Sequence, residues 1–464
     1  MKRIISVLLI VVALFIASHA SITTIQGIIT GGSTKSIRLI QYTDFLTGLR
    51  KTLAIANVDQ NGGFMLHADL SETTWAMLAF GFQEGEICLQ PGQVYEVKIE
   101  IQAGQKGTSF FDRSPLMIIF VKDDKDLLNN GIQEFNIMYN DFIINNAESL
   151  YRPGKKELFE TFRSQVSGEF GNISNQYLRD YIRYKEASME QFMKLKSRES
   201  LAREYLIGQQ VLYNNVEYFY FFSQFFDKYF LAGNRYISYA ETEDMINENM
   251  SARQILDTLD KDPVLKDDYM KELVLLSSLK ELYKTAGFKK PNILALAGQI
   301  KDQSMYESNR KIASNLVQRL NWLQPGTLAP EFILTGTDGT VHRSSDFKGK
   351  YTYLGFIISK SPSCQVEIDQ QSQLYNDFGD KVNFVSISAD QDINTLKDYT
   401  REKNISWTVL HYDDDYDLLD RYDVRTFPIY LLIDPSGKIY CNPTPTPTEN
   451  IRQMLEGIKE GTGK

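Results

Sequence analysis

The chain has 464 residues, a formal net charge of −9 and 43% hydrophobic residues. This acidic balance argues against general nucleic-acid binding, and the length is too great for a single core, so several domains are expected. The only cysteines are Cys88, Cys364 and Cys441, and an odd number this small excludes a disulfide framework.

Residues 1–20 have the pattern of a secretory signal peptide. Two basic residues, Lys2 and Arg3, precede a short apolar stretch, and a small-x-small motif ends at Ala20. We therefore predict a mature chain that starts at Ser21, with a retained anchor as the alternative. The sequence near the predicted cleavage point lacks the cysteine of a lipoprotein, and no later segment is apolar enough to predict a membrane helix.

Residues 21–118 alternate apolar and polar residues in short runs, which is the period of half-buried strands. Ser36–Tyr42 and Val94–Ile101 are examples, and the Asn-Gly-Gly at 61–63 is typical of a hairpin turn. The pattern predicts a small antiparallel β-sandwich in which Cys88 is an inert core thiol. Its role stays open between a packing or spacing module and carbohydrate binding.

Residues 119–325 change to a helical period and predict a middle all-α domain, as the spacing of Phe159, Phe162 and Val166 illustrates. Ten aromatic residues lie between positions 213 and 230. They favour either an exposed groove for a peptide or second subunit, or a helix that is buried on most sides.

Residues 326–464 alternate strands and helices and predict an α/β domain. Tyr351–Ile358 is a run of strand formers, Ser361-Pro-Ser-Cys364 follows it, and Val382–Ser388 is typical of a buried parallel strand. A hairpin through residues 434–437 would place Cys441 opposite Tyr430, at the same end of the sheet as Cys364. A Cys364–Cys441 disulfide is therefore an open alternative.

Several motifs of the last 140 residues occur together in the order of a known family. They are Gly326-Thr-Leu-Ala-Pro-Glu-Phe332, Asp338-Gly-Thr340 with Ser345-Asp-Phe-Lys-Gly-Lys350, Tyr422-Asp-Val-Arg-Thr-Phe-Pro428, and the hairpin from Ile429 to Ile439. This part of the chain resembles the TlpA-like branch of the thioredoxin superfamily, and the first 300 residues resemble multidomain members more loosely. The resemblance implies a thioredoxin fold, a cis-proline at Pro428 and thiol–disulfide exchange at a Cys-x-x-Cys motif.

The chain departs from the family at the residue that starts this chemistry. Carried across position by position, Ser361 stands where the family has the nucleophilic cysteine, and Cys364 stands at the resolving position. Lys360 replaces the tryptophan that often precedes the motif. A serine oxygen cannot exchange disulfides, so the resemblance implies a catalytic pair, Ser361 and Cys364, that is degenerate. Lys360 and Pro362, with Thr426, Phe427 and Pro428, would form the substrate groove.

Four interpretations of Cys364 remain open at this point. It is a half-buried relic, a thiol that exchanges with an unidentified partner cysteine, the single cysteine of a peroxiredoxin-like peroxidase, or part of a non-catalytic groove that holds a peptide at Pro428. The spacing of Ser361 and Cys364 suits a peroxiredoxin and Arg425 resembles its arginine, but Ile357 stands where a peroxiredoxin has proline.

The resemblance implies export to the periplasm or envelope of a Gram-negative bacterium, with protein or peptide thiols and disulfides as partners. No nucleic acid and no cofactor are expected. No metal is expected either, because His67, His342 and His411 are scattered without the spacing of metal ligands. The sequence carries no signal for an oligomeric state.

Overall fold

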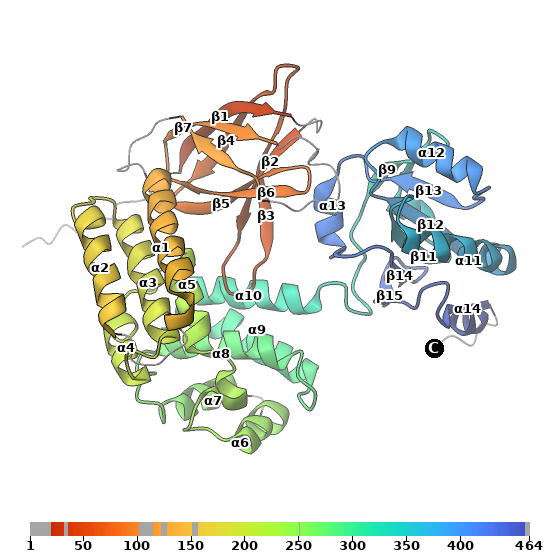
Figure 1. Cartoon of the computed structure of the whole chain (residues 1–464). Helices are drawn as coiled ribbons and strands as arrows, with labels where there is room; N and C mark the ends of the chain where they lie inside the picture. Colours follow the sequence, from red (N-terminus) through yellow and green to blue (C-terminus); the bar gives the residue numbers. More distant parts are fainter. Residues whose placement is uncertain are drawn as a thin grey trace, which may run out of the picture.

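The computed structural model describes residues 20–31, 36–101, 115–121, 128–150, 156–249 and 251–459. The predicted signal peptide lies outside these residues, apart from Ala20. The described chain has an N-terminal region of strands, a middle region of helices and a C-terminal α/β domain, in the predicted order (Figure 1). The domain limits at residues 118 and 325 stay predictions.

Two four-stranded sheets form the N-terminal region. Their strands are β1 (Ser21–Thr30), β2 (Ser36–Tyr42), β3 (Arg50–Asn57), β4 (Gly63–Leu70), β5 (Thr74–Phe80), β6 (Gln83–Leu89), β7 (Val94–Glu100) and β8 (Ile118–Phe120). One sheet has the order β4-β1-β7-β8 and the other β3-β2-β5-β6. Apolar residues of both sheets, among them Ile25, Leu66, Leu39 and Leu78, share one core, which makes the region a sandwich.

The expectation of an entirely antiparallel sandwich is wrong for one pair of strands. β1 and β7 run parallel, with Thr24 opposite Val94 and Thr30 opposite Glu100. The two strands are far apart in the sequence, so no hairpin turn fixes their direction and local turn signals could not reveal it.

The middle region is helical, as predicted. Its helices are α1 (Leu128–Leu150), α2 (Lys156–Phe170), α3 (Gln176–Phe192), α4 (Arg198–Tyr205), α5 (Val216–Phe225), α6 (Tyr239–Asp244), α7 (Ala252–Leu259), α8 (Asp268–Leu282), α9 (Lys290–Gln303) and α10 (Glu307–Asn321). None of the helices in the described ranges is long and apolar enough to cross a bilayer.

The aromatic run around α5 is core. Tyr218, Phe221, Phe222 and Tyr229 are all fully buried or nearly so, whereas Tyr220 is exposed. This burial favours the buried-helix interpretation over an exposed groove, because apolar side chains on most sides of a helix need neighbours on most sides.

The C-terminal domain has a five-stranded sheet in the order β13-β12-β11-β14-β15, with helices packed around it. Its strands are β9 (Ile333–Thr335), β10 (Val341–Arg343), β11 (Tyr351–Ile357), β12 (Val382–Ser388), β13 (Thr408–His411), β14 (Ile429–Ile433) and β15 (Ile439–Cys441). Its helices are α11 (Pro362–Phe378), α12 (Ile393–Glu402), α13 (Tyr416–Arg421) and α14 (Ile451–Lys459). β11, β12 and β13 are parallel, and β14 and β15 are antiparallel to their neighbours.

The predicted position of Cys441 is wrong. Cys441 lies opposite Leu432 and not opposite Tyr430, a displacement of two residues. One residue of this displacement is already present at the Ile433–Ile439 pair next to the turn, and a bulge between Leu432 and Ile433 adds the other. Leu432 is paired in turn with Tyr353, in the N-terminal half of β11. Cys364 lies beyond the C-terminal end of that strand, at the start of α11. The three cysteines are all free, so the Cys364–Cys441 disulfide is also excluded in this structure.

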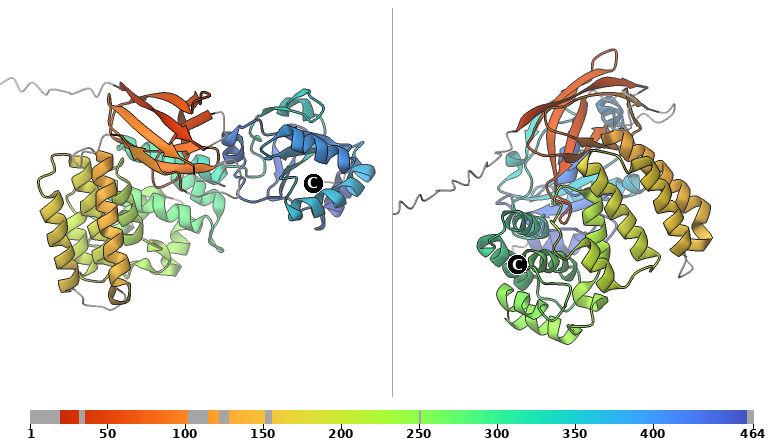
Figure 2. Two further views of the ribbon diagram at one scale, coloured as in Figure 1. Left: turned by 45° about the horizontal axis from the view of Figure 1, so that its top comes forward. Right: turned by 90° about the vertical axis from the view of Figure 1, so that its left-hand side faces the viewer.

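The sandwich contacts both other parts of the chain. Toward the helices, Asn129 of α1 makes two hydrogen bonds of 2.8 Å with the backbone of Cys88, and Trp75 stacks on Tyr181. On its other side, the sandwich contacts α13 of the C-terminal domain, through Arg38 and Asp417. The C-terminal domain stands beside the rest of the molecule in the left-hand view of Figure 2.

Candidate functional site at the start of α11

The strand–turn–helix unit from β11 to α11 positions the motif. Ser361 is the residue that precedes the helix, and Pro362 occupies its first turn, where a missing N–H costs no helical hydrogen bond. The Ser361 side chain does not cap the helix. Its hydroxyl lies 2.9 Å from the hydroxyl of Ser363. Lys360 is exposed in the turn ahead of them.

Cys364 lies in the first turn of α11 and is fully buried. The backbone N–H of Ile358, the residue directly after β11, donates to the sulfur of Cys364 across 3.4 Å. Burial raises the pKa of the Cys364 thiol, and the hydrogen bond from Ile358 and the nearby hydroxyls of Ser361 and Ser363 offset only part of this rise. At neutral pH the group is therefore a protonated, enclosed thiol.

The segment that leads into β14 lies against the start of α11. The Ser363 hydroxyl donates to the carbonyl oxygen of Phe427 across 3.3 Å, and the Phe427–Pro428 peptide bond is cis. Phe427 is buried and Thr426 is exposed beside it. The fold thus brings Ser361, Pro362 and Cys364 together with residues 426–428.

A buried carboxylate that sequence analysis missed lies beneath the turn. Asp390, at the end of β12, accepts the Ser359 N–H at 3.0 Å and the Ser359 hydroxyl at 2.9 Å, and it also accepts from Ser388. The pair Ser388 and Asp390 could have been a signal, since polar residues at the carboxyl ends of parallel strands gather at one edge of the sheet. Asp390 fixes the turn in front of α11, and its negative charge contributes to the raised pKa of Cys364.

A second missed residue is Glu367, one helical turn after Cys364. It accepts from the hydroxyls of Thr446 and Thr448 at 3.0 and 2.7 Å and from the Thr448 N–H at 2.8 Å. These contacts hold the proline- and threonine-rich segment 443–448 against α11, close to the motif.

The two other thiols lie elsewhere. Cys88 is buried in the sandwich, and burial raises the pKa of its thiol. Cys441 is half-buried, with its sulfur 3.4 Å from the carbonyl oxygen of Pro443. Within the described ranges, no three His, Cys, Asp or Glu side chains are grouped so that they could hold a metal ion.

The sheet order, the helix after β11 and the motif at its start define the class of this domain as a thioredoxin fold. Residues 325–441 match the AhpC/TSA family. The chain belongs to this family of the thioredoxin superfamily through its C-terminal domain.

Known thiol–disulfide oxidoreductases are similar to this domain. The chain is 30% identical over 141 residues to the thiol-disulfide oxidoreductase ResA of Bacillus subtilis, a match that covers 30% of this chain and 78% of that protein. ResA of Geobacillus thermodenitrificans is 28% identical over 136 residues, covering 29% and 78%. The solved thioredoxin domain of a Bacteroides vulgatus thiol-disulfide oxidoreductase is 25% identical, covers 30% of this chain and 98% of that domain, and has a TM-score of 0.27.

Proposed function

We propose that this protein is a thioredoxin-family member that has lost dithiol exchange and uses the surface around Thr426–Pro428 to hold an extended segment of a protein partner. The observation that carries the proposal is the pair of residues at the start of α11. A hydroxyl stands at Ser361, and the one sulfur of the motif, that of Cys364, is buried.

Disulfide exchange requires a thiolate that attacks one sulfur of a disulfide, while the other sulfur leaves as a thiolate. Ser361 has no sulfur with which to form the mixed disulfide. Cys364 has one, but it has no exposed surface and its pKa is raised by burial, so its attacking form is scarce and enclosed. Both facts support a loss of exchange at this site.

The surface of the site keeps features that suit a polypeptide ligand. Lys360, Pro362 and Thr426 are exposed around the buried Phe427. An extended segment can bind such a surface through backbone hydrogen bonds and side-chain contacts without any covalent step. The family relation suggests that the partner is a protein that carries thiols or disulfides.

Single-cysteine chemistry at Cys364 is the second candidate. The N–H of Ile358 donates to the sulfur, and this hydrogen bond and the nearby hydroxyls of Ser361 and Ser363 favour the thiolate. They would assist reaction with a thiol partner if the turn opened. A peroxiredoxin-like peroxidase has less support, because peroxide must reach a thiolate and this sulfur is enclosed.

We also propose export to the cell envelope. The proposal rests on the signal-like pattern of residues 1–20 and on no structural observation. Fractionation of cells that express the full chain would test it, with the processed protein expected outside the cytoplasm.

Partner capture from envelope extracts tests the binding proposal. We expect the wild-type chain and Cys364→Ala to retain the same partners and to release them without a reductant. Thr426→Trp should lose these partners, whereas Thr161→Trp, at an exposed threonine of α2, should keep them. Partners that elute only after reduction, and that disappear with Cys364→Ala, would overturn the binding proposal in favour of the second candidate.

A further inference from the structure

The segment of residues 421–428 joins α13 to β14 and ends in the surface of the proposed function. Its backbone is bonded to α13, because the N–H of Asp423 donates to the carbonyl oxygen of Asp420 at 3.1 Å and the N–H of Val424 donates to that of Leu419 at 2.8 Å. The position of the segment therefore depends on α13 and on whatever holds α13.

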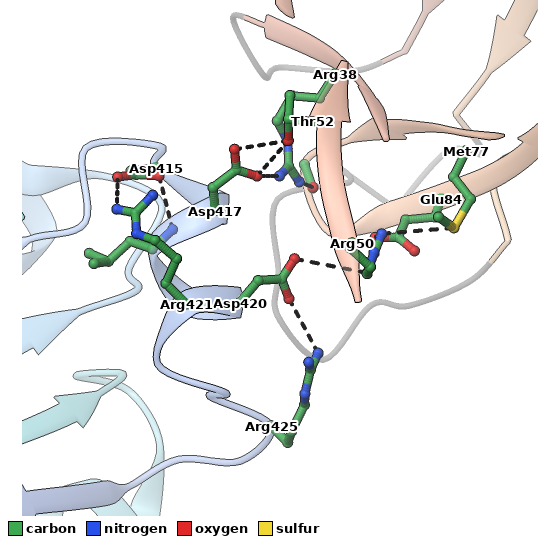
Figure 3. A network of polar contacts seen from close by, with 12 residues as sticks. Arg38, Arg50, Thr52, Met77, Glu84, Asp415, Asp417, Asp420, Arg421 and Arg425 are labelled. Carbon is green, nitrogen blue, oxygen red and sulfur yellow. Dashed lines mark hydrogen bonds and ion pairs between the residues drawn. The ribbon is translucent and has the colours of Figure 1, made fainter. Parts of the chain in front are cut away.

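The sandwich holds α13 through Asp417. This carboxylate accepts from Arg38 at 2.7 Å, and the hydroxyl of Thr52 lies 2.9 and 3.1 Å from its two oxygens (Figure 3). The guanidinium of Arg38 also lies over the ring of Tyr416, 4.7 Å from its centre, and Phe82 meets the same ring edge-on. Charge-assisted hydrogen bonds of this kind fix an orientation as well as a distance, so α13 is oriented by the sandwich.

Arg425, the residue directly before the proposed binding surface, lies where all three parts of the chain meet. Two carboxylates hold its guanidinium group, that of Asp420 at 3.3 Å and that of Asp423 at 3.0 Å. Asp420 also faces Arg50 of the sandwich at 3.9 Å, and Asp423 faces Arg319 of α10 at 3.9 Å. Partly exposed pairs at this distance are weak singly, so they act as a network together with the contacts of Asp417.

The linker after α10 holds the backbone of the same segment. The indole N–H of Trp322 donates to the carbonyl oxygen of Arg421 at 2.7 Å. The helix α10 is itself tied to the sandwich, since the side-chain amide of Asn315 donates to Asp44 at 2.7 Å. The segment is therefore held from two sides by parts of the chain that precede the thioredoxin domain.

We propose that the sandwich and the helical region position residues 421–428, and thereby set the conformation in which Thr426–Pro428 is presented to a partner. Arg425 and Asp417 are the positioning residues. This inference rests on the proposed function in one respect, namely that Thr426–Pro428 binds a partner. The two preceding parts of the chain then act on binding through α13 and the linker, and need no contact with the partner.

Hydrogen–deuterium exchange on the whole mature chain tests the positioning without a partner. Thr52→Val removes one hydroxyl from the contact with α13 and keeps the shape of the side chain, and Trp322→Phe removes the indole N–H and keeps an aromatic ring. Exchange follows the local opening equilibrium. Each variant should therefore exchange about fivefold faster at the amides of Asp423 and Val424, the effect of one hydrogen bond.

Two controls separate positioning from a general loss of stability. The amides of α12, in the same domain, should exchange at the wild-type rate in both variants. Thr24→Val removes a hydroxyl that is bonded to His67 on the other sheet of the sandwich, and should leave the segment unchanged. Unchanged exchange of the segment in both Thr52→Val and Trp322→Phe, or an equal acceleration in α12, would overturn the proposal.

Arg425 is tested by a conservative variant beside a neutral one. Arg425→Lys keeps a positive charge for Asp420 and Asp423, whereas Arg425→Gln removes it. Arg425→Gln should accelerate exchange of the segment about fivefold, and Arg425→Lys should restore most of the protection. Equal exchange in the two variants would show that Arg425 does not position the segment through its charge.

Partner capture distinguishes this inference from the proposed function. If Thr52→Val accelerates exchange and also lowers the amount of captured partner, the positioning and the binding surface are both supported. If it accelerates exchange while Thr426→Trp still captures every partner, the positioning stands and the proposed function fails alone. If exchange is unchanged while Thr426→Trp loses its partners, the positioning fails alone.

Discussion

The N–H of Ile358, the residue directly after β11, points at the sulfur of Cys364 in the first turn of α11 across 3.4 Å. This contact encloses the only thiol of the motif behind backbone. A thiol that attacks the disulfide of another protein needs the opposite arrangement, a sulfur that is exposed to solvent. The contact therefore sets the expectations for redox experiments.

The mature protein should fail to catalyse insulin reduction by dithiothreitol. Its rate should equal that of a protein-free control, because Ser361 cannot form the mixed disulfide. Turbidity of the precipitating insulin B chain measures the rate, and Cys364→Ala should give the same result. A clear rate above the control that disappears in Cys364→Ala would refute the expectation.

The three thiols should react in a fixed order with a maleimide in the native state. Cys441 should be labelled first, because it is half-exposed, whereas Cys88 and Cys364 are fully buried with raised pKa values. Peptide mapping after a timed quench gives the order, and labelling in denaturant gives the full yield. Labelling of Cys364 ahead of Cys441 would contradict the enclosed thiol described above.

Ser361→Cys should create a working pair. The new thiol would stand at the N-terminus of α11, where the helix dipole should lower its pKa below about 8.5, and it would have Cys364 three residues away. Mass spectrometry should detect an intramolecular disulfide, and insulin reduction should appear. Ser363→Cys is the matched control, since it adds a thiol in the same turn without the Cys-x-x-Cys spacing.

The outcomes of this experiment differ in meaning. A disulfide together with activity shows that only the nucleophile is missing. A disulfide without activity indicates that the groove at Thr426–Pro428 has also diverged. If no disulfide forms, Ser361 does not occupy the nucleophile position.

The pH dependence of stability should change in Glu186→Gln. Burial in the helical region raises the pKa of Glu186 to about 7 from its ordinary value of 4.5. Between pH 4.5 and pH 7 the folded state therefore keeps a proton on Glu186 that the unfolded chain releases. The contribution of this proton to the free energy of unfolding is complete below pH 4.5 and is lost as the pH rises through 7.

The shift corresponds to about 3 kcal/mol. Glu186→Gln should match the wild type near pH 4.5 and exceed its unfolding free energy by about this amount at pH 8. Urea titrations at both pH values measure the difference. Glu134→Gln, at an exposed position of α1, serves as the control. A parallel pH dependence in Glu186→Gln and wild type would contradict the raised pKa.

The domain contact should show coupling between Arg38 and Asp417. Asp417→Ala leaves a buried guanidinium without its ion pair, which should cost about 3 kcal/mol. Arg38→Met should cost less, because Asp417 is partly exposed and can be hydrated. The double variant should lose less than the sum of the two. Urea unfolding of all four proteins gives the cycle, and additive losses would show that the pair is not coupled.

The sequence predicted much of the fold because the deciding signals are local. The change of period near residue 120, the strand–turn–helix around Ser361 and the motif that ends at Pro428 each lie within a few residues. The position of Cys441 was predicted wrongly because the turn pairs Ile433 with Ile439 and a bulge in β15 adds one more residue, and nothing in the local sequence marks either shift. Asp390 and Glu367 were missed because their partners come from distant segments.

The ion pair of α13 with the sandwich limits how the two domains can diverge. The Arg38 side chain is only 7% exposed, so replacement of Asp417 alone would strand a charge away from water. A related thioredoxin domain grafted onto this sandwich would need its own acid at the position of Asp417, or its contact with the sandwich would be weakened. Substitutions at the two positions should therefore be tolerated better in pairs than singly.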